Sequence, residues 1–230
     1  MAGKSEQRLT TEKVAYWYFR LNGYLQMESF IVHPESGGGQ RTEADLIGVR
    51  FPYRAERLIG RPDDIMQDDF QKLELRDGCI DIAIIEVKTN RPCDLNGPWT
   101  DKDLENVQRV LAAIGCFPTD QLNQAADSIY SNGIFEDETG RLRVRLIAIG
   151  ASKNEELSAD YPQVVQITWR EVLGFIGDRL FRYRKSKSNT NQWDDEITLL
   201  KDLVSSNKSG HQFQKGGFID DCLRLLGVHS

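Results

Sequence analysis

Two charged side chains interrupt the most apolar segment of the chain. Residues 79–89 (CIDIAIIEVKT) alternate in the manner of a β-strand, and Glu86 and Lys88 share a face with the isoleucines at every second position before them. Toward the C-terminal end of this segment the opposite face is apolar as well, and two apolar faces are typical of a central strand. Because an uncompensated buried charge is strongly destabilising, Glu86 and Lys88 must meet a partner, an ion or solvent.

A second carboxylate comes from the preceding predicted strand. Asp45 lies in residues 43–51 (EADLIGVRF), a segment that Pro52 stops. If the two strands are neighbours, their backbones lie about 4.8 Å apart, and Asp45 and Glu86 can bind one divalent cation. Hard oxygen ligands in small number suit Mg²⁺, which keeps several waters. An isolated Glu-x-Lys triplet is common by chance, however, and two solvated charges at the end of a strand are then the simpler interpretation.

The remaining elements must position these residues. Apolar spacing of three and four residues predicts helices, and runs of β-branched and aromatic residues predict strands. The core order is helix, three strands, helix and strand. Helices are predicted over residues 11–22, 101–114, 121–132, 169–183, 193–204 and 218–227, and strands over 24–33, 43–51, 79–89, 141–150 and 163–168.

The chain length predicts one α/β domain with an extension. We expect residues 1–185 to form this domain and residues 186–230 to form a C-terminal helical extension packed on it. Residues 53–78 are a charged insertion between two strands. Its four aspartates are expected to form a solvated face: Asp63, Asp64, Asp68 and Asp69.

These features together resemble the PD-(D/E)xK, or restriction-endonuclease-like, nuclease superfamily. The matching residues are Asp45 and then Glu86-Val87-Lys88, on consecutive predicted strands of an αβββαβ core, and the similarity covers residues 10–150. Ala44 stands where this motif has a proline before the first carboxylate. The resemblance implies a restriction-endonuclease-like fold, with a mixed central sheet flanked by helices.

The resemblance also implies a Mg²⁺-dependent nuclease that hydrolyses phosphodiester bonds, with DNA as the favoured substrate and Mn²⁺ able to substitute. Asp45 and Glu86 would hold the ion with the Val87 carbonyl, and Lys88 would orient or deprotonate the attacking water. Endonuclease action is favoured over exonuclease action, and a homodimer would suit the cutting of both strands. The alternatives are an inactive nuclease-like module that binds nucleic acid or protein, and an ordinary α/β domain with surface charges.

Two accessory residues have competing interpretations. Glu12, in the first helix, occupies a place from which some branches of the superfamily contribute an acid, but a glutamate in the first turn is also favoured by the helix dipole. Gln108 lies on the apolar edge of the helix after the Glu-x-Lys strand, where the superfamily often has a glutamine lining the site. Structural hydrogen bonding explains Gln108 equally well.

Positive charge is concentrated near the end of the predicted helix 169–183. Contact with nucleic-acid phosphates and a solvated helix end that carries cations are equally good interpretations. Trp99 could stack on a base, although core packing is the favoured interpretation. The cationic cluster consists of Arg179, Arg182, Arg184, Lys185 and Lys187.

The composition excludes several other classes. The net charge of −6 excludes a protein coated in phosphate-binding charge, although a local basic groove remains compatible with it. The four cysteines form no Cys-x-x-Cys pair and the three histidines are far apart, so reduced thiols and no zinc site are expected. No apolar run is long enough to span a bilayer and no signal peptide is visible, so a cytoplasmic location without membrane contact is expected.

Overall fold

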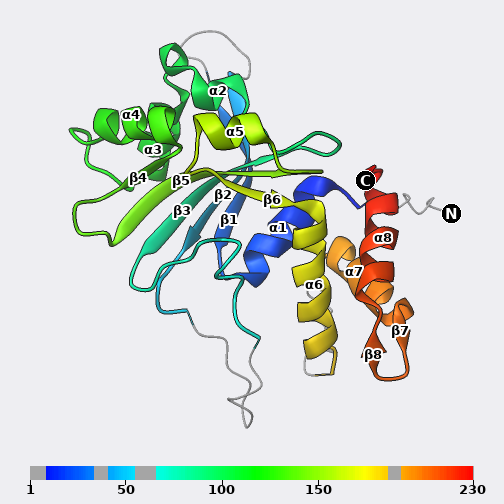
Figure 1. Ribbon diagram of the computed structural model, residues 1–230. Helices are drawn as coiled ribbons and strands as arrows, with labels where there is room; N and C mark the ends of the chain where they lie inside the picture. Colours follow the sequence, from blue (N-terminus) through cyan, green and yellow to red (C-terminus); the bar gives the residue numbers. More distant parts are fainter. Residues whose placement is uncertain (1–8, 34–40, 55–65, 186–192, 230) are drawn as a thin grey trace, which may run out of the picture.

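The computed structural model describes residues 9–33, 41–54, 66–185 and 193–229 (Figure 1). Its centre is a six-stranded sheet in the order β1-β2-β3-β5-β4, with β6 also paired to β5. The β1–β2, β2–β3 and β4–β5 pairs are antiparallel, and the β3–β5 and β5–β6 pairs are parallel. The strands are β1 (Leu25–Val32), β2 (Thr42–Arg50), β3 (Ile80–Val87), β4 (Ile134–Glu136), β5 (Leu142–Gly150) and β6 (Val165–Thr168).

Helices cover both faces of the sheet (Figure 1). One face packs in the α3/α4 core, and the other packs in the α1/α6 core, which also takes in the last two helices. The α3/α4 side carries α2 (Gly97–Thr100), α3 (Asn106–Ile114), α4 (Leu122–Asn132) and α5 (Glu155–Asp160). The α1/α6 side carries α1 (Thr11–Leu21), α6 (Trp169–Tyr183), α7 (Asp195–Ser206) and α8 (Lys215–Leu226).

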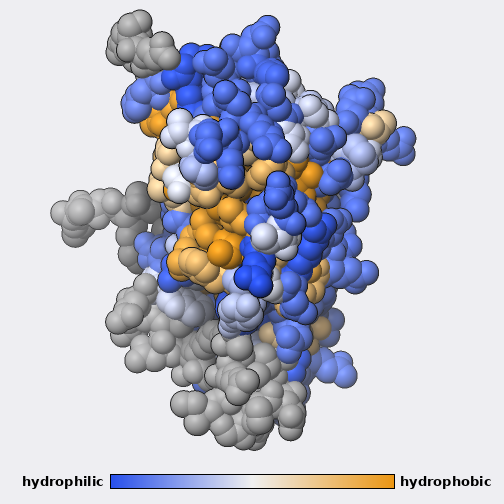
Figure 2. All heavy atoms as spheres, turned by 90° about the vertical axis from the view of Figure 1, so that its left-hand side faces the viewer, coloured by the Kyte–Doolittle hydropathy of each residue, from blue (hydrophilic) through white to orange (hydrophobic). Residues whose placement is uncertain are grey.

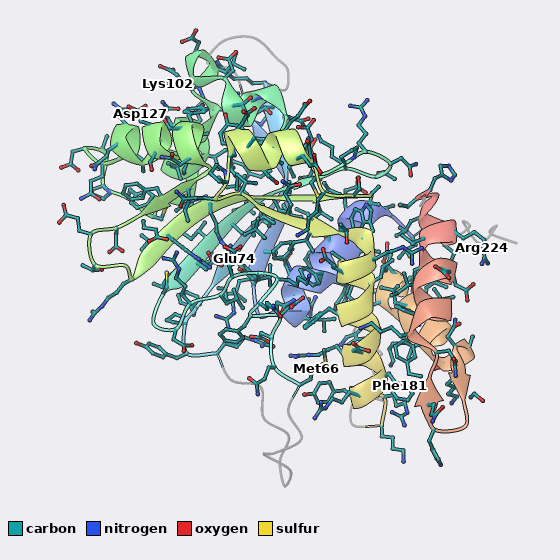
Figure 3. The ribbon with its side chains drawn as sticks, in the orientation of Figure 1. Met66, Glu74, Lys102, Asp127, Phe181 and Arg224 are labelled. Carbon is teal, nitrogen blue, oxygen red and sulfur yellow. The ribbon has the colours of Figure 1, made fainter. Side chains whose placement is uncertain are left out.

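The expectation of an α/β fold with a mixed sheet between helices is confirmed. The predicted helix 101–114 is wrong in its first part. Glu105 adopts a left-handed conformation with φ 52°, and this breaks the segment into the 3-10 turn η2 (Lys102–Leu104) and α3. An ion pair of 2.7 Å between Lys102 and Asp127 joins this turn to α4 (Figure 3).

Several short elements were not predicted. These are α2, β4, α5 and the hairpin of β7 (Lys208–Ser209) with β8 (Gln212–Phe213), none of which exceeds six residues. Segments of this length are too short to show a helical or strand period. The four cysteines form no disulfide, and no helix among the described residues is long and apolar enough to cross a membrane.

The charged insertion is not the solvated face that we expected. The Asp68 side chain is only 6% exposed and pairs with Arg50, Arg54 and Arg179. Asp69 accepts a hydrogen bond of 2.8 Å from the Tyr18 hydroxyl. Asp63 and Asp64 lie outside the described residues.

Buried arginines also bind the backbone of this segment. The Met66 carbonyl accepts from Arg179 at 2.6 Å, beside α6, and the Glu74 carbonyl accepts from Arg143 at 2.7 Å, beneath the sheet (Figure 3). The segment therefore covers the sheet through polar contacts as well as through Leu73, which is fully buried in the α1/α6 core.

Candidate active site

The site forms where the β2–β3 ladder stops and β3 continues alone with β5. The last β2–β3 pair is Leu46–Ile85, whereas β3 stays paired to β5 as far as Val87–Ile149. The Lys88 N–H donates to the Ile149 carbonyl at 2.8 Å, on the β5 side. Because successive peptide groups of a strand point to opposite neighbours, the Val87 peptide groups face β2.

Asp45 satisfies the backbone group that the ladder leaves open. Its Oδ2 accepts a hydrogen bond of 2.7 Å from the Val87 N–H. The carboxylate thus replaces a strand carbonyl, which brings Asp45 to the backbone between Glu86 and Lys88. The three residues that the sequence singled out therefore converge at one end of the sheet.

Irregular backbone turns Asp45 toward β3. Ala44 packs in the α3/α4 core and Leu46 in the α1/α6 core, although residues two apart on a regular strand share a face. Opposite Asp45 the β1–β2 register has a gap, and Ser29 there has φ 49°, which is uncommon for a residue other than glycine. The strand changes faces at Asp45, so its side chain points along the sheet.

Glu86 is buried, with 3% exposure, and takes hydrogen bonds from three donors. Its Oε1 accepts from Lys88 Nζ at 2.7 Å and from the Asn96 amide, and its Oε2 accepts from the Trp99 indole at 2.8 Å. Lys88 also donates to Asn96 Oδ1 at 2.5 Å. Glu86, Lys88 and Asn96 thus form a closed triangle, with Trp99 fixing the other carboxylate oxygen.

Asn96 and Trp99 are the site residues that the sequence did not reveal in this role. Asn96 precedes α2 as its N-cap, yet its side chain makes no capping hydrogen bond and turns to Glu86 and Lys88 instead. An asparagine at this position normally accepts from the helix backbone. Trp99 is 1% exposed in the α3/α4 core, so core packing is confirmed, but its indole N–H also carries the contact with Glu86.

Burial and a like charge disturb the ionisation of Asp45. Burial raises the pKa of Asp45 to about 6, with repulsion from Glu86 and a smaller contribution from Glu12 in the same direction. The Val87 N–H and the Lys88 ammonium oppose this shift. At neutral pH the fold therefore holds an ionised Asp45 that its surroundings disfavour.

This crowding predicts a more stable protein when Asp45 loses its charge. Because the pKa is raised in the fold, the ionised carboxylate destabilises the native state as pH rises from about 4 through about 6. Without metal, Asp45→Asn should melt above wild type at pH 7.5, and the gain should shrink toward pH 4, where Asp45 is protonated. Thermal unfolding with EDTA measures both. As a control, Asp127→Asn removes a half-exposed surface carboxylate and should show no such pH-dependent gain. An Asp45→Asn protein that melts lower at both pH values would contradict this account.

The start of α1 lies beside the end of β3. The Thr11 and Thr89 hydroxyls are 2.9 Å apart, and Glu12 Oε2 accepts from the Thr11 hydroxyl at 3.3 Å. Glu12 is exposed, and its charge acts on Asp45. The structure therefore brings Glu12 to the rim of the site.

Gln108 lies on α3, which covers the sheet face that carries Glu86. It is half-buried, and its Oε1 is buried without a hydrogen-bond partner in the part of the chain that the structure describes. Among the described residues no hydrogen bond joins it to Asp45 or Glu86.

The cationic cluster lies at the far end of α6 from the site. The Trp169 indole at the start of α6 donates to the Lys88 carbonyl at 2.9 Å, whereas the cluster follows about 20 Å along the helix axis. Arg179 is 1% exposed and binds Met66 and Asp68, so its assignment to nucleic acid was wrong. Burial with protein partners leaves it no access to a phosphate.

The other members of the cluster have separate surroundings. Arg184 is half-buried, packs its guanidinium 3.9 Å from the centre of the Phe181 ring and donates to the Phe181 carbonyl. Arg182 and Lys185 are exposed, and Lys187 lies outside the described residues.

The described residues contain no group of three or more His, Cys, Asp or Glu side chains that could hold a metal. The candidate donor set is therefore the Asp45–Glu86 pair with backbone oxygen, which resembles the few protein ligands that Mg²⁺ requires. No protein-family model, no curated protein and no solved structure matches this chain.

Proposed function

We propose that this protein is a Mg²⁺-dependent nuclease of the PD-(D/E)xK type that hydrolyses phosphodiester bonds of DNA. The observation that carries the proposal is the contact of Asp45 with the Val87 N–H, at the open end of the β2–β3 ladder. It brings a second carboxylate next to Glu86 and Lys88 from a strand 42 residues away. The order α1, β1, β2, β3, α3 and β5 agrees with the αβββαβ core of a restriction-endonuclease-like fold.

The donor set fits a hard divalent cation. A carboxylate offers about four lone-pair sites, and Glu86 uses three of them for Lys88, Asn96 and Trp99. Asp45 Oδ2 accepts the hydrogen bond from the Val87 N–H, and no described residue donates a hydrogen bond to Asp45 Oδ1. Burial raises the pKa of Asp45 and repulsion from Glu86 adds to this shift, and a cation between the two carboxylates would relieve that repulsion. Mg²⁺, with Mn²⁺ as a substitute, is the ion we propose for Asp45, Glu86 and the Val87 carbonyl.

Lys88 is the group of this set that can serve the reaction. Its side chain is 12% exposed, against 4% for Glu86, so the ammonium lies between the buried carboxylate and the surface. The contacts with Glu86 and Asn96 fix Nζ in place, where it can orient the attacking water and offset phosphate charge. In the reaction a water oxygen bonds to phosphorus as one ester P–O bond breaks. A bound divalent cation would supply an activated water and charge stabilisation.

A homodimer is the assembly that suits the proposed endonuclease action on duplex DNA. Each site cuts one strand, so cleavage of both strands of a duplex by an endonuclease would use a homodimer. The site lies at one end of the sheet, near the start of α1 and the loop that carries Asn96 (Figure 1).

Replacing Lys88 should separate metal binding from turnover. Lys88→Ala removes no proposed ligand, so Mg²⁺ should still raise the melting temperature, while cleavage of plasmid, linear and single-stranded DNA falls by about a hundredfold or more. The measurement pairs thermal unfolding with and without Mg²⁺ with a gel assay of cleavage.

Lys102→Ala is the matched control. That lysine is 61% exposed and pairs with Asp127 on the surface, so its loss should leave cleavage unchanged. Wild-type cleavage that persists in EDTA would contradict the proposal. A wild-type protein that binds DNA but cleaves none of the substrates with Mg²⁺ or Mn²⁺ would favour the inactive binding module.

A further inference from the structure

A second cleft opens along α1, away from the paired carboxylates. It has a volume of about 660 Å³ and lies between α1, the start of β1 and the segment that follows β2. Its lining contains three aromatic side chains and two arginines. The lining residues are Tyr16, Arg20, Gly23, Tyr24, Leu25, Gln26, Phe51 and Arg54.

The charge of this lining is the opposite of the charge of the chain. Among the described residues no carboxylate lines the cleft, although the chain as a whole has net charge −6. Arg54 pairs with Asp68, a carboxylate that it shares with Arg50 and Arg179. Arg20 is exposed, and no ion pair with a carboxylate is recorded for it in the part of the chain that the structure describes. The cleft is therefore suited to an anionic ligand.

The guanidinium of Arg20 is held in place before any ligand binds. It donates to the Tyr16 hydroxyl at 2.9 Å and lies 4.6 Å from the centre of the Trp17 ring. Such contacts restrain a planar guanidinium, the group whose fork of donors matches phosphate. Less side-chain freedom is then lost when an anion binds.

Aromatic surface is exposed next to this arginine. Phe51 is 53% exposed and lines the cleft, and Tyr53 beyond it is 88% exposed. Leu25, which also lines the cleft, is 67% exposed. Exposed aromatic side chains can act as surfaces on which bases stack, and this stacking depends little on the nucleic-acid sequence.

We propose that this cleft binds a nucleotide of single-stranded nucleic acid, with the base against Phe51 and the phosphate at Arg20. A cation and an exposed aromatic surface in one cleft match the two parts of a nucleotide, whereas an apolar partner would leave Arg20 unpaired. The cleft thus indicates single-stranded nucleic acid as the substrate class. This reading of the ligand as a substrate rests on the proposed nuclease function.

The exposed face of α1 connects the cleft to the candidate active site. Glu12, Tyr16 and Arg20 follow one another at intervals of four residues and so lie along one side of the helix. Glu12 is at the rim of the site and Arg20 in the cleft, about 12 Å apart along the helix axis. A single strand bound at Phe51 and Arg20 can therefore continue along α1 toward Asp45.

Other apolar surface is less informative. Hydrophobic residues gather in the middle of the face seen in Figure 2, within a largely hydrophilic surround. Met27 and Ile31 of the edge strand β1 are 54% and 41% exposed. Neither residue is among those that line the cleft with Arg20 and Phe51, so they do not identify a ligand.

The affinity of the cleft can be measured without cleavage. Wild-type protein in EDTA should bind a fluorescent oligothymidylate of about 12 nucleotides, followed by anisotropy. Phe51→Ala should weaken binding about tenfold or more, and Phe51→Tyr should restore it. Arg20→Gln should also weaken binding and reduce the log-log salt slope by about 0.7 for one lost phosphate contact.

Two variants on α8 are the controls. Leu225→Ala removes an apolar side chain that is 49% exposed, and Arg224→Gln removes a cation that is 76% exposed. Both should bind like wild type. Equal affinity of Phe51→Ala and Leu225→Ala would overturn the proposal. A second result would also overturn it: wild-type protein sediments as a dimer, Phe51→Ala sediments as a monomer, and the affinity for the oligonucleotide per chain is unchanged. The cleft would then be an interface between copies of the chain.

Cleavage assays separate this inference from the proposed function. If Mg²⁺-dependent cleavage occurs but Phe51 and Arg20 do not affect oligonucleotide binding, the nuclease function stands and the cleft assignment fails. If binding depends on these residues but no DNA is cut, the cleft assignment stands and the nuclease function fails.

Discussion

Glu86→Gln should abolish Mg²⁺-dependent cleavage, with a loss of about a thousandfold or more. Glu86 is the buried ligand of the proposed ion, and metal stabilisation of the transition state amounts to several kcal/mol, with each tenfold in rate about 1.4 kcal/mol. The variant keeps the size of the side chain and can still accept from the Trp99 indole. A plasmid-nicking time course with Mg²⁺ measures the rate.

The metal-dependent rise in melting temperature should disappear in the same variant, which distinguishes Glu86→Gln from Lys88→Ala. Glu136→Gln is the matched control, since Glu136 pairs with Arg76 near the surface and lies on β4. It should cleave like wild type. Full activity in Glu86→Gln, or an equal loss in Glu136→Gln, would remove the metal assignment.

Asp81→Asn should destabilise the protein by about 3–5 kcal/mol. Asp81 is 1% exposed and receives hydrogen bonds from Arg143 at 2.8 Å, from Arg145 at 2.7 Å and 2.9 Å, and from the Tyr24 hydroxyl. Both arginines are 1% exposed, so the loss of the carboxylate leaves two buried cations without their counter-ion. Thermal unfolding should show a fall of about 10 °C or more.

Asp220→Asn is the comparison for this variant. Asp220 pairs with Arg170 at 3.2 Å, and both side chains are more than half exposed. An exposed pair contributes about 0–1 kcal/mol, so the melting temperature should barely change. A small effect of Asp81→Asn, similar to that of Asp220→Asn, would show that the buried pair does not stabilise the fold.

The ionisation of Asp81 also fixes the direction of the pH dependence. Burial alone would raise the pKa of Asp81, but Arg145 and Arg143 outweigh it and hold the pKa below its usual value. The stabilisation is therefore complete above the unfolded pKa of about 3.9 and is lost as pH falls through the lower folded pKa. The gap in stability between wild type and Asp81→Asn should thus narrow in acid.

Local sequence was sufficient for the long elements because their periodicity reflects burial. The strand predicted over 79–89 is β3, the strand predicted over 43–51 is β2, and the helix predicted over 169–183 is α6. A strand with two apolar faces can only lie inside a sheet, and a charged end on such a strand must meet a partner. This reasoning placed Glu86 and Lys88 correctly at the end of a central strand.

The contacts around these charges depend on residues from other elements. Asn96 and Trp99 reach Glu86 through a loop and a four-residue helix that show no period. Asp45 reaches Val87 only because β2 changes faces opposite Ser29. Neither feature is encoded by a repeat in the local sequence.

Tertiary structure alone decided which arginines are buried. Arginine is usually a surface residue, but Arg145 and Arg179 are each only 1% exposed. Asp81 and Asp68 provide the counter-charges that allow this burial. In sequence these partners lie 64 and 111 residues away. The sequence by itself determined which segments are buried, because apolar burial repeats with the local backbone geometry. Whether a charged side chain is buried depends on a partner that only the folded chain brings close, since burial without one is strongly unfavourable.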